Sequence, residues 1–460
     1  MTKSRQQSLL THGGFRSVGP LALACVLLST AHLEAQSPQV PADTQSVRSA
    51  AEAYAASAQR GADPRRPPQS KPGALTLQQA VEQAKARNPT ILATEENLRA
   101  VRGQEIQAAV RANPNFTLYG TDITENASAV TPYNYSAQVS RLFERGQKRR
   151  WRMDDAKATS AETEAQLNDQ IRQTVLAVKQ AFTKMLVAKE ALELATATLK
   201  DYRHEVEVGE DRYKAGDLAK LDYERLDLQL ASFESDQSSD IVSLQQASYQ
   251  LQTLLGMDKP SDEFDVMGDV IPPVITETRA SLEQKAMDAR PDFAAARFAV
   301  NAADANYKLV AANGTTDPTL EMEYDRSGTE NSVGFSVNIP LRLFDRNQGN
   351  KQTAKFQASS ARFTLTAARN QVASDVDQAW VAYTEARRLS DRFSDRYLDE
   401  SHDVLNISQY AFEHGGLTLI DYLDALRQFR SSTSDALSAY QNTWLAVHQL
   451  SAASATELVP

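Results

Sequence analysis

The sequence predicts a mainly α-helical protein with a small β part, in which long antiparallel helical hairpins follow pairs of short strands. Two observations predict the helices. No proline occurs between Pro132 and Pro260 or between Pro340 and Pro460, and a proline inside a helix costs about 3 kcal/mol. One of these spans also carries an apolar seam with a seven-residue repeat. The strands are predicted by two segments before each span that alternate polar and apolar side chains.

The beginning of the chain has the features of a secretory signal peptide, predicted over residues 1–35. Basic residues precede the apolar run PLALACVLLSTA at 20–31, which is too short to span a bilayer, and Ala35 ends a plausible cleavage site. The only cysteine, Cys25, lies inside this run, and its lipidation is the alternative to cleavage at Ala35. Residues 36–74 are rich in Ala, Gln, Ser and Pro and are expected to form a mobile leader.

The rest of the chain contains an internal sequence repeat. RLFERGQ at 141–147 returns as RLFDRNQ at 342–348, and GDLAKLDYERLD at 216–227 has a counterpart in GGLTLIDYLDAL at 415–426. Landmarks that keep one order and nearly one spacing indicate two structural repeats of about 200 residues. We expect the repeats at 75–270 and 271–455, followed by a short tail at 456–460.

The first helix of the first hairpin is expected over residues 147–208, which at 1.5 Å per residue is roughly 90 Å. Its apolar residues recur every seven positions, with Val175 and Phe182 between them: Ile171, Val178, Met185, Leu192, Leu199 and Val206. This is coiled-coil periodicity. Gly209 is expected to interrupt the span. The helix is either a solvated coiled-coil spacer or a wall of a long tube.

Two strand-like segments precede each hairpin. They lie at 115–125 and 133–143 in the first repeat, and at 319–328 and 331–341 in the second. Each is about ten residues long, which is enough to cross a bilayer as a tilted strand. Four strands cannot close a barrel, and lipid does not tolerate open sheet edges. Either several chains share one barrel, or these are ordinary hairpins on a soluble body.

The turn of each hairpin contains glycine, which adopts the positive φ needed for a reversal between helices. The turns are expected at Gly216 and at Gly415 with Gly416. An acid pair, Asp421 and Asp424, follows the second turn. In a local interpretation, Thr418 and Asp421 resemble a capping box, and Asp424 pairs with Arg427. The equivalent residues of the first repeat, Asp222 and Arg225, have opposite charges.

Composition and motifs argue against several classes of function. The chain has 23% charged residues and a formal net charge of −10, whereas nucleic-acid binding needs clustered Lys and Arg. The histidines lack metal-ligand spacing such as H-E-x-x-H, and no phosphate loop or G-x-S-x-G elbow occurs. The sequence therefore predicts neither an enzyme nor a bound cofactor or metal.

Residues 75–455 resemble the TolC family of bacterial outer-membrane channels. The resemblance rests on the doubled plan of helix, strand pair and hairpin, and on the junction IPLRLFDRNQGN at 339–350. It also rests on the turn segments RYKAGDLAKLDYERL at 212–226 and FEHGGLTLIDYLDAL at 412–426. The first turn is most similar to the heavy-metal branch of the family, whose partners are proton-driven cation pumps.

The resemblance implies a homotrimer in the outer membrane. Three chains contribute four strands each to a twelve-stranded barrel, and the helical hairpins form a periplasmic tunnel. The channel is the passive exit duct of a tripartite efflux pump with a periplasmic adaptor and an inner-membrane transporter. The basic run KRRWR at 148–152 is then a charged helix start at the membrane boundary. A duct for type I protein secretion and a soluble periplasmic coiled-coil scaffold are the alternatives.

The resemblance also implies a gate at the inner mouth of the tunnel. Asp421 and Asp424 match a pair of aspartates that ring this constriction, so three chains bring six carboxylates together. Phe412 and Leu417 occupy positions where a tyrosine and an arginine help to hold the mouth shut in the best-known drug exporter. A hydrophobic contact is therefore expected in place of a polar latch. The turns project furthest inward, so the predicted adaptor contacts are Gly216, Asp222, Arg225, Gly415 and Gly416.

Overall fold

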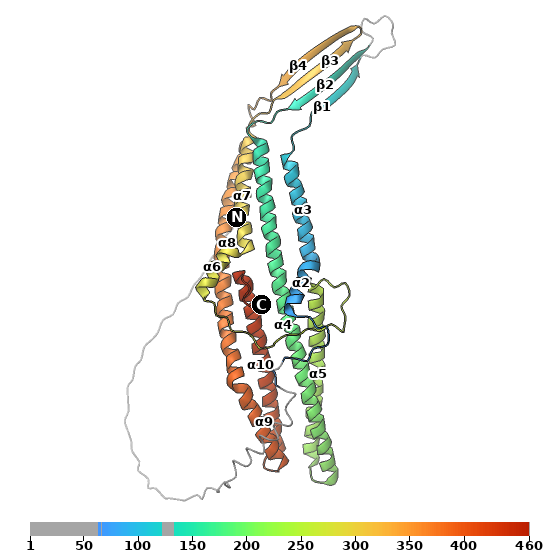
Figure 1. The fold of residues 1–460 in the computed structure, drawn as a ribbon, viewed down its shortest axis with the longest axis vertical. Helices are drawn as coiled ribbons and strands as arrows, with labels where there is room; N and C mark the ends of the chain where they lie inside the picture. The colour runs from blue at the N-terminus through green and yellow to red at the C-terminus, as the bar shows by residue number, and fades with distance from the viewer. Residues whose placement is uncertain (1–62, 66, 122–132, 460) are drawn as a thin grey trace, which may run out of the picture. The chain divides into compact units, whose positions relative to one another are not determined.

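The computed structural model describes residues 63–65, 67–121 and 133–459 (Figure 1). The predicted signal peptide, Cys25 and most of the predicted leader lie outside these residues. The first repeat consists of α2 (Leu77–Arg87), α3 (Pro89–Ala109), β1 (Asn115–Thr121), β2 (Asn134–Leu142), α4 (Lys148–Ala215) and α5 (Lys220–Leu254). The second consists of α6 (Arg279–Ala289), α7 (Pro291–Ala312), β3 (Thr319–Ser327), β4 (Glu330–Asn338), α8 (Gln348–Arg392), the π-helical turn η1 (Phe393–Tyr397), α9 (Leu398–Glu413) and α10 (Leu419–Ser454).

Each repeat contains the predicted long hairpin. The 68 residues of α4 form a helix of about 100 Å at 1.5 Å per residue. The expectation that Gly209 interrupts this span was wrong, because Gly209 lies inside α4. A Cβ atom at this position would come within 2.6 Å of the Leu226 Cδ1 atom on α5. Gly209 therefore leaves room for the Leu226 side chain of α5. None of the described helices is long and apolar enough to cross a membrane.

The seven-residue seam of α4 is confirmed as the packed side of the helix. Four of its six members are buried: Val178, Met185, Leu199 and Val206. The intermediate residue Phe182 is buried as well, whereas Ile171, Val175 and Leu192 are half-buried. The partners of α4 are α2, α3, α5, α7 and α10, so the helix is packed along its length. This packing favours the tube wall over the solvated spacer.

We expect replacement of Met185 by alanine to lower the free energy of unfolding by about 2–5 kcal/mol, the usual cost of truncating a large apolar side chain in a core. Met185 is only 2% exposed and lies in the largest apolar cluster. Leu192→Ala should cost less, because Leu192 is half-buried. Chemical denaturation in detergent, followed by circular dichroism, measures both. Unchanged stability in both variants would contradict burial of the seam.

In each repeat, a side chain at the junction of the two short helices binds a backbone carbonyl at the end of the hairpin's returning helix. In the first, the amide Nδ2 of Asn88 donates a hydrogen bond to the Leu254 carbonyl at the end of α5, at 2.8 Å. In the second, Arg290 Nη1 donates to the Ala453 carbonyl in the last turn of α10, at 3.3 Å. Both anchors precede a proline that opens the next helix. The hairpin's returning helix is thus fixed to the helix–helix junction in each repeat.

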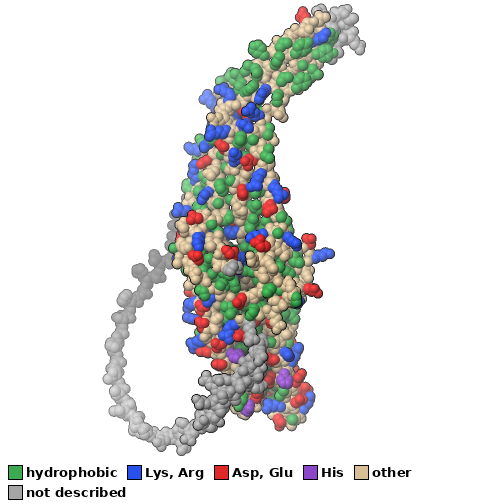
Figure 2. Space-filling model, viewed as in Figure 1, with side chains coloured by type: hydrophobic (Ala, Val, Ile, Leu, Met, Phe, Trp, Pro, Cys, Tyr) green, Lys and Arg blue, Asp and Glu red, His purple; other side chains and the backbone are tan. Residues whose placement is uncertain are grey.

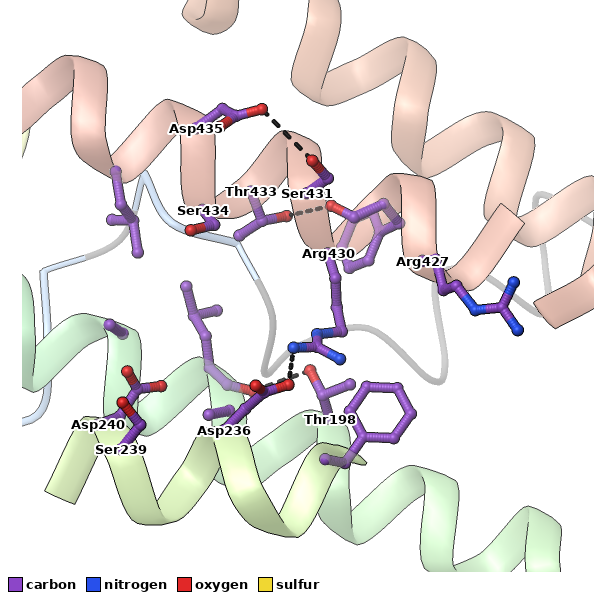
Figure 3. A pocket seen from close by; sticks show the side chains of 16 residues that line it. Thr198, Asp236, Ser239, Asp240, Arg427, Arg430, Ser431, Thr433, Ser434 and Asp435 are labelled. Carbon is purple, nitrogen blue, oxygen red and sulfur yellow. Dashed lines mark hydrogen bonds and ion pairs between the residues drawn. The ribbon is translucent and has the colours of Figure 1, made fainter. Parts of the chain in front are cut away.

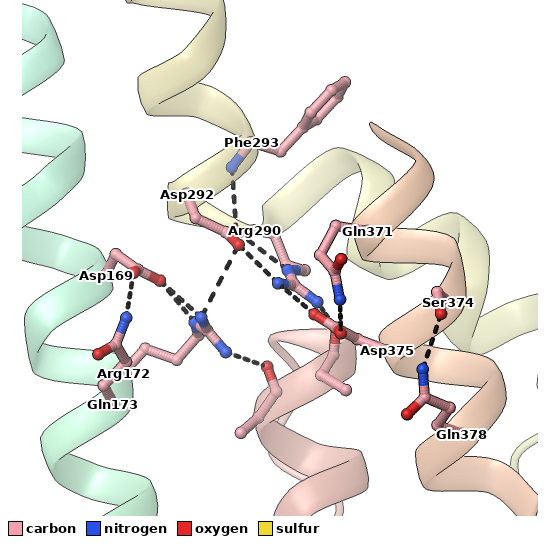
Figure 4. A network of polar contacts seen from close by, with 12 residues as sticks. Asp169, Arg172, Gln173, Arg290, Asp292, Phe293, Gln371, Ser374, Asp375 and Gln378 are labelled. Carbon is pink, nitrogen blue, oxygen red and sulfur yellow. Dashed lines mark hydrogen bonds and ion pairs between the residues drawn. The ribbon is translucent and has the colours of Figure 1, made fainter. Parts of the chain in front are cut away.

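Arg290 is also the centre of a polar network that joins α7, α8 and α4 (Figure 4). Its guanidinium lies 2.5 Å from the Asp292 carboxylate and 2.9 Å from that of Asp375 on α8. Arg172 on α4 lies 2.6 Å from Asp169 and 4.0 Å from Asp292. Because Arg290 is almost fully buried, its two carboxylate partners are required to balance its charge.

The four strands form one antiparallel sheet in the order β1-β2-β3-β4, so the predicted strand pairs exist and the two repeats join between β2 and β3. One row across the sheet pairs four apolar residues: Phe116, Val139, Met322 and Phe335. All four are exposed. Figure 2 shows apolar side chains covering this part of the molecule. β1 and β4 are the edge strands of the described sheet.

The end of the predicted leader contacts the helical body. The Lys71 N–H donates to the Asp265 carboxylate at 2.7 Å, and the Gln69 N–H donates to the Glu193 carboxylate at 3.1 Å. Beside Glu193 on α4 lies Glu190, which is 4% exposed and whose Oε2 atom has no hydrogen-bond partner among the described residues. Burial, together with the nearby charges of Glu193 and Asp63, raises the pKa of Glu190 to about 8.

Candidate functional site

The candidate site is built around the two hairpin turns, beginning with the second. Here α9 ends at Glu413 and α10 begins at Leu419. Gly415 has a φ of 73°, the left-handed conformation expected of it. The N–H of Gly416 donates a hydrogen bond to the Ala411 carbonyl at 2.7 Å, which closes the end of α9. The predicted position and the conformational reason for this turn are both confirmed.

Asp421 takes part in the cap of α10. The Asp421 N–H donates to the Thr418 Oγ1 atom at 3.3 Å, and the Thr418 hydroxyl donates to the Asp421 carboxylate at 2.6 Å. A carboxylate in the first turn of a helix is also favoured by the helix dipole. Thr418 is therefore confirmed as the N-cap, and Asp421 supports the cap through the Thr418 hydroxyl instead of the backbone N–H that a capping box would use. Its carboxylate is exposed at the turn, so the cap leaves it available to a second role.

Asp424 lies one turn further along α10 and pairs with Arg427 at 2.5 Å. More than half of each side chain is exposed, and an exposed ion pair contributes only about 0–1 kcal/mol to stability. Arg427 Nε also donates to the Gln229 side chain on α5, at 3.2 Å. Asp424 is thus connected through Arg427 to the first hairpin. The gate role of Asp421 and Asp424 stays a prediction.

Phe412 and Leu417 pack within one chain. The Phe412 ring stacks on the ring of Tyr422, with centroids 5.2 Å apart and an angle of 4° between the planes. Leu417 is half-buried against the same apolar cluster, which also contains Leu419 and Leu426. The two residues therefore form apolar contacts, as expected of them, and these contacts join α9 to α10. Whether they also close the tunnel mouth stays a prediction.

The first turn has the same construction. Gly216 has a φ of 86°, and Asp222 pairs with Arg225 at 3.3 Å. Tyr213 stacks on Tyr223, with centroids 5.3 Å apart and an angle of 4° between the planes. Sequence reasoning missed this aromatic pair. The signal was present, because Tyr213 and Tyr223 are ten residues apart, as are Phe412 and Tyr422 in the second turn.

Above the turns, a cleft of about 440 Å³ lies between the first hairpin and α10 (Figure 3). Arg430 on α10 reaches across it to the Asp236 carboxylate on α5, and its guanidinium lies 4.6 Å from the centre of the Phe233 ring. Burial lowers the pKa of Arg430 and raises that of Asp240, which also lines the cleft. The sequence did not predict this link, since it joins residues 194 positions apart.

The described histidines do not form a metal site. Within the described ranges, no group of three His, Cys, Asp or Glu side chains could hold a metal ion. His414, beside the second turn, stacks on Tyr410 with ring centroids 4.0 Å apart. His448 on α10 is buried against Thr183 of α4, at 2.9 Å, and burial together with Lys179 lowers its pKa to about 3. His448 is therefore neutral at physiological pH.

Comparison with known proteins gives a consistent result. Residues 80–257 and 282–456 match the model of a family described as outer membrane efflux protein. The chain is 26% identical over 366 residues to the cobalt-zinc-cadmium resistance protein CzcC of Cupriavidus metallidurans, across 78% of this chain and 85% of that protein.

Two solved structures share the fold. One is a membrane protein from Pseudomonas aeruginosa, with a TM-score of 0.73 and 20% identity over 82% of this chain and 92% of that chain. The other is CusC, described for its transmembrane channel formation, with a TM-score of 0.72 and 18% identity over 83% of this chain and 92% of that chain.

Proposed function

The chain belongs to the outer membrane efflux protein family, and on that premise we propose that three copies form a passive, cation-selective exit channel of a tripartite pump. Membership places the protein in the outer membrane as an efflux channel and rules out the soluble periplasmic scaffold. It also supports a barrel shared by several chains over ordinary hairpins on a soluble body.

The sheet supports the trimer. One of its faces carries exposed apolar residues in register across all four strands, as in the row from Phe116 to Phe335. The edge strands β1 and β4 need partners, because an unpaired backbone group in lipid costs several kcal/mol. Strands from two further copies would pair both edges. Three chains then give twelve strands, enough for a barrel with an open interior.

The acid pair carries the proposal of cation selectivity. Asp421 and Asp424 are both exposed within one turn of helix at the tip of the second hairpin. Three copies would supply six carboxylates at one constriction, and a ring of carboxylates favours cations in a pore. The similarity to CzcC, a cobalt-zinc-cadmium resistance protein, supports divalent metal cations as the cargo.

The hairpin turns are the proposed contacts for the other pump components. Gly216 and Gly415 place the two turns at the hairpin tips, and the pair Asp222 and Arg225 presents both charges beside the first turn. A periplasmic adaptor would bind the turn residues, including Gly416, and would join the channel to a proton-driven transporter in the inner membrane.

We expect the double variant Asp421→Asn, Asp424→Asn to lose cation selectivity in planar bilayers while it still folds, because asparagine also caps helices. The reversal potential in a salt gradient should move toward zero. Block by divalent cations should weaken about tenfold or more, since one unit charge at 4 Å contributes about 1 kcal/mol even in bulk water.

Asp222→Asn is the matched control, because Arg225 already balances that turn. It should change the reversal potential and the block much less. Equal selectivity and block in the wild type and the double variant would reduce the acid pair to a helix cap and an exposed ion pair. The gate would then be sought at Phe412 and Leu417.

A further inference from the structure

Basic residues gather where the strands meet the helices. The chain has a net charge of −10, yet the segment at 141–152 holds six basic residues and one acidic residue. The segment at 342–355 holds four basic residues and one acidic residue. Figure 2 shows Lys and Arg side chains gathered at this level of the molecule, next to the apolar surface of the sheet.

Two acidic groups of this region form ion pairs with inner cations, and a third, Asp345, accepts a hydrogen bond from the Asn347 N–H at 2.8 Å. Asp317 lies 2.5 Å from the buried Lys148, and Glu144 lies 2.7 Å from Arg152. In the part of the chain that the structure describes, six outer cations form no ion pair with a carboxylate. We call these six the basic collar: Arg111, Arg141, Arg145, Lys308, Arg342 and Arg346.

Contacts between elements bring the collar together. Arg149 Nε at the start of α4 donates to the Ala109 carbonyl at the end of α3, at 2.7 Å. Asn347 at the start of α8 donates to the Val310 carbonyl near the end of α7, at 2.7 Å. Lys308 of α7 lies 4.9 Å from the centre of the Trp151 ring of α4. Four helix ends thus meet at one level.

Large apolar side chains alternate with the collar. On the segment after β4, Leu341 is 78% exposed and Phe344 is 92% exposed. At the end of β2, the Arg141 guanidinium lies 5.4 Å from the centre of the exposed Phe143 ring, which directly follows the strand. Exposure of such large apolar side chains to water is unfavourable. A membrane interface, in contrast, accommodates aromatic rings and basic side chains side by side.

The surroundings of Arg342 favour an anionic ligand. It lines a cavity of about 380 Å³ together with the amide side chains of Asn306, Asn313, Asn347 and Asn350. Its Nε atom is buried and has no hydrogen-bond partner among the described residues. An unsatisfied guanidinium N–H beside several amide groups is the donor set that a phosphate oxygen accepts.

We propose that the basic collar binds the phosphate headgroups of anionic phospholipids at the periplasmic boundary of the outer membrane. This inference rests on the proposed function, because it needs the sheet to lie in the membrane. Arg342 and Arg346 bind phosphate oxygens, while Leu341 and Phe344 enter the acyl region above them. The exposed apolar residues favour a lipid over a free phosphate ion, and the like charges of the collar disfavour a second copy.

The same pattern of two arginines and a phenylalanine occurs in both repeats. Arg141, Phe143 and Arg145 precede Arg342, Phe344 and Arg346 by 201 residues in each case. A trimer would therefore present six such sites around its circumference, one at each junction. Six regularly spaced headgroup sites would fix the height of the barrel in the membrane.

The test uses the full-length trimer in detergent and measures binding of fluorescent phosphatidylglycerol, with phosphatidylcholine as the neutral lipid. We expect R342Q/R346Q to weaken phosphatidylglycerol binding, and R141Q/R145Q to do the same for the first repeat. A basic residue near an anionic lipid surface contributes about fivefold in affinity, so each double variant should lose at least about fivefold. Phosphatidylcholine binding should not change.

The control is K214Q/K220Q, which removes two exposed lysines at the opposite end of the first hairpin. It should bind phosphatidylglycerol as the wild type does. Unchanged affinity in both collar variants overturns the proposal, as does displacement of the lipid by millimolar inorganic phosphate. Loss of the trimer mass in the variants would instead identify the collar as a contact between copies. Channel conductance in planar bilayers, measured in parallel, tests the proposed function separately.

Discussion

Replacement of Glu190 by glutamine is expected to stabilise the protein at alkaline pH and to reduce the pH dependence of its stability above pH 5. Burial, Glu193 and Asp63 raise the pKa of Glu190 from its usual value near 4.5 to about 8, against the opposing charge of Lys189. The folded protein therefore holds the carboxyl neutral at physiological pH, where an unfolded chain has it ionised.

The direction in which stability changes with pH follows from proton binding. Because the pKa is higher in the folded state, the stability that the neutral carboxyl contributes is fully present below pH 4.5 and is lost as pH rises through 8. At 1.36 kcal/mol per pKa unit, the full loss is on the order of 5 kcal/mol as an upper bound. Glutamine does not ionise, so Glu190→Gln should exceed the wild type by on the order of 2–4 kcal/mol at pH 9.

Chemical denaturation at pH 5, 7 and 9 measures this effect. At pH 5 the two proteins should be alike, because Glu190 is then protonated in the folded state. The matched control is Glu385→Gln, whose side chain is 61% exposed in an ion pair with Arg388. It should change stability by at most about 1 kcal/mol at any of these values. A parallel pH profile for Glu190→Gln and the wild type would contradict a neutral buried Glu190.

The sequence could predict the parts of the fold that local periodicity determines. The seam through Val178 and Met185, the two strand pairs and the turns at Gly216 and Gly415 are all visible as repeated patterns. Each depends on residues close to one another in the chain. The offset of about 200 residues between repeats supplied the only long-range information, and it correctly paired the two turns.

What the sequence could not predict depends on contacts between distant segments. Glu190 is buried between Glu193, which binds Gln69, and Lys189, which binds Asp265, and the period of α4 implies neither of these contacts. Arg430 meets Asp236 only because the two hairpins pack together. Gly209 resembled a helix break because its true role, close packing against Leu226, requires the position of α5.

The Arg290 network is the second place where a large effect is expected, because it combines burial with charge. Arg290 is 4% exposed, and it binds Asp292 of α7, Asp375 of α8 and the Ala453 carbonyl of α10. Truncation of one member of a buried ion pair typically costs 3–5 kcal/mol, since the remaining charges lose their partner. Arg290→Ala should therefore lower the free energy of unfolding by about 3–5 kcal/mol at pH 7.

The cost of Arg290→Ala should shrink in acid. Burial acts to raise the pKa of Asp292, but the hydrogen bonds and charge of Arg290 outweigh it and hold that pKa below its usual value of 3.8. The stabilisation from a carboxyl with a lowered pKa is present above 3.8 and is lost as pH falls through the lower folded value. As pH falls through that lowered value the wild type loses this advantage, so the stabilities of the two proteins should approach each other.

The control is Arg388→Ala, which breaks an exposed pair of the same chemistry on α8 at 2.8 Å and should cost at most about 1 kcal/mol. Denaturation of both variants at pH 7 and pH 3 separates the two cases. A cost for Arg290→Ala as small as that of the control would show that the network is no more than a set of solvated pairs. The anchor between the helix–helix junction and α10 would then rest on the apolar cluster around Leu282 and Leu450 alone.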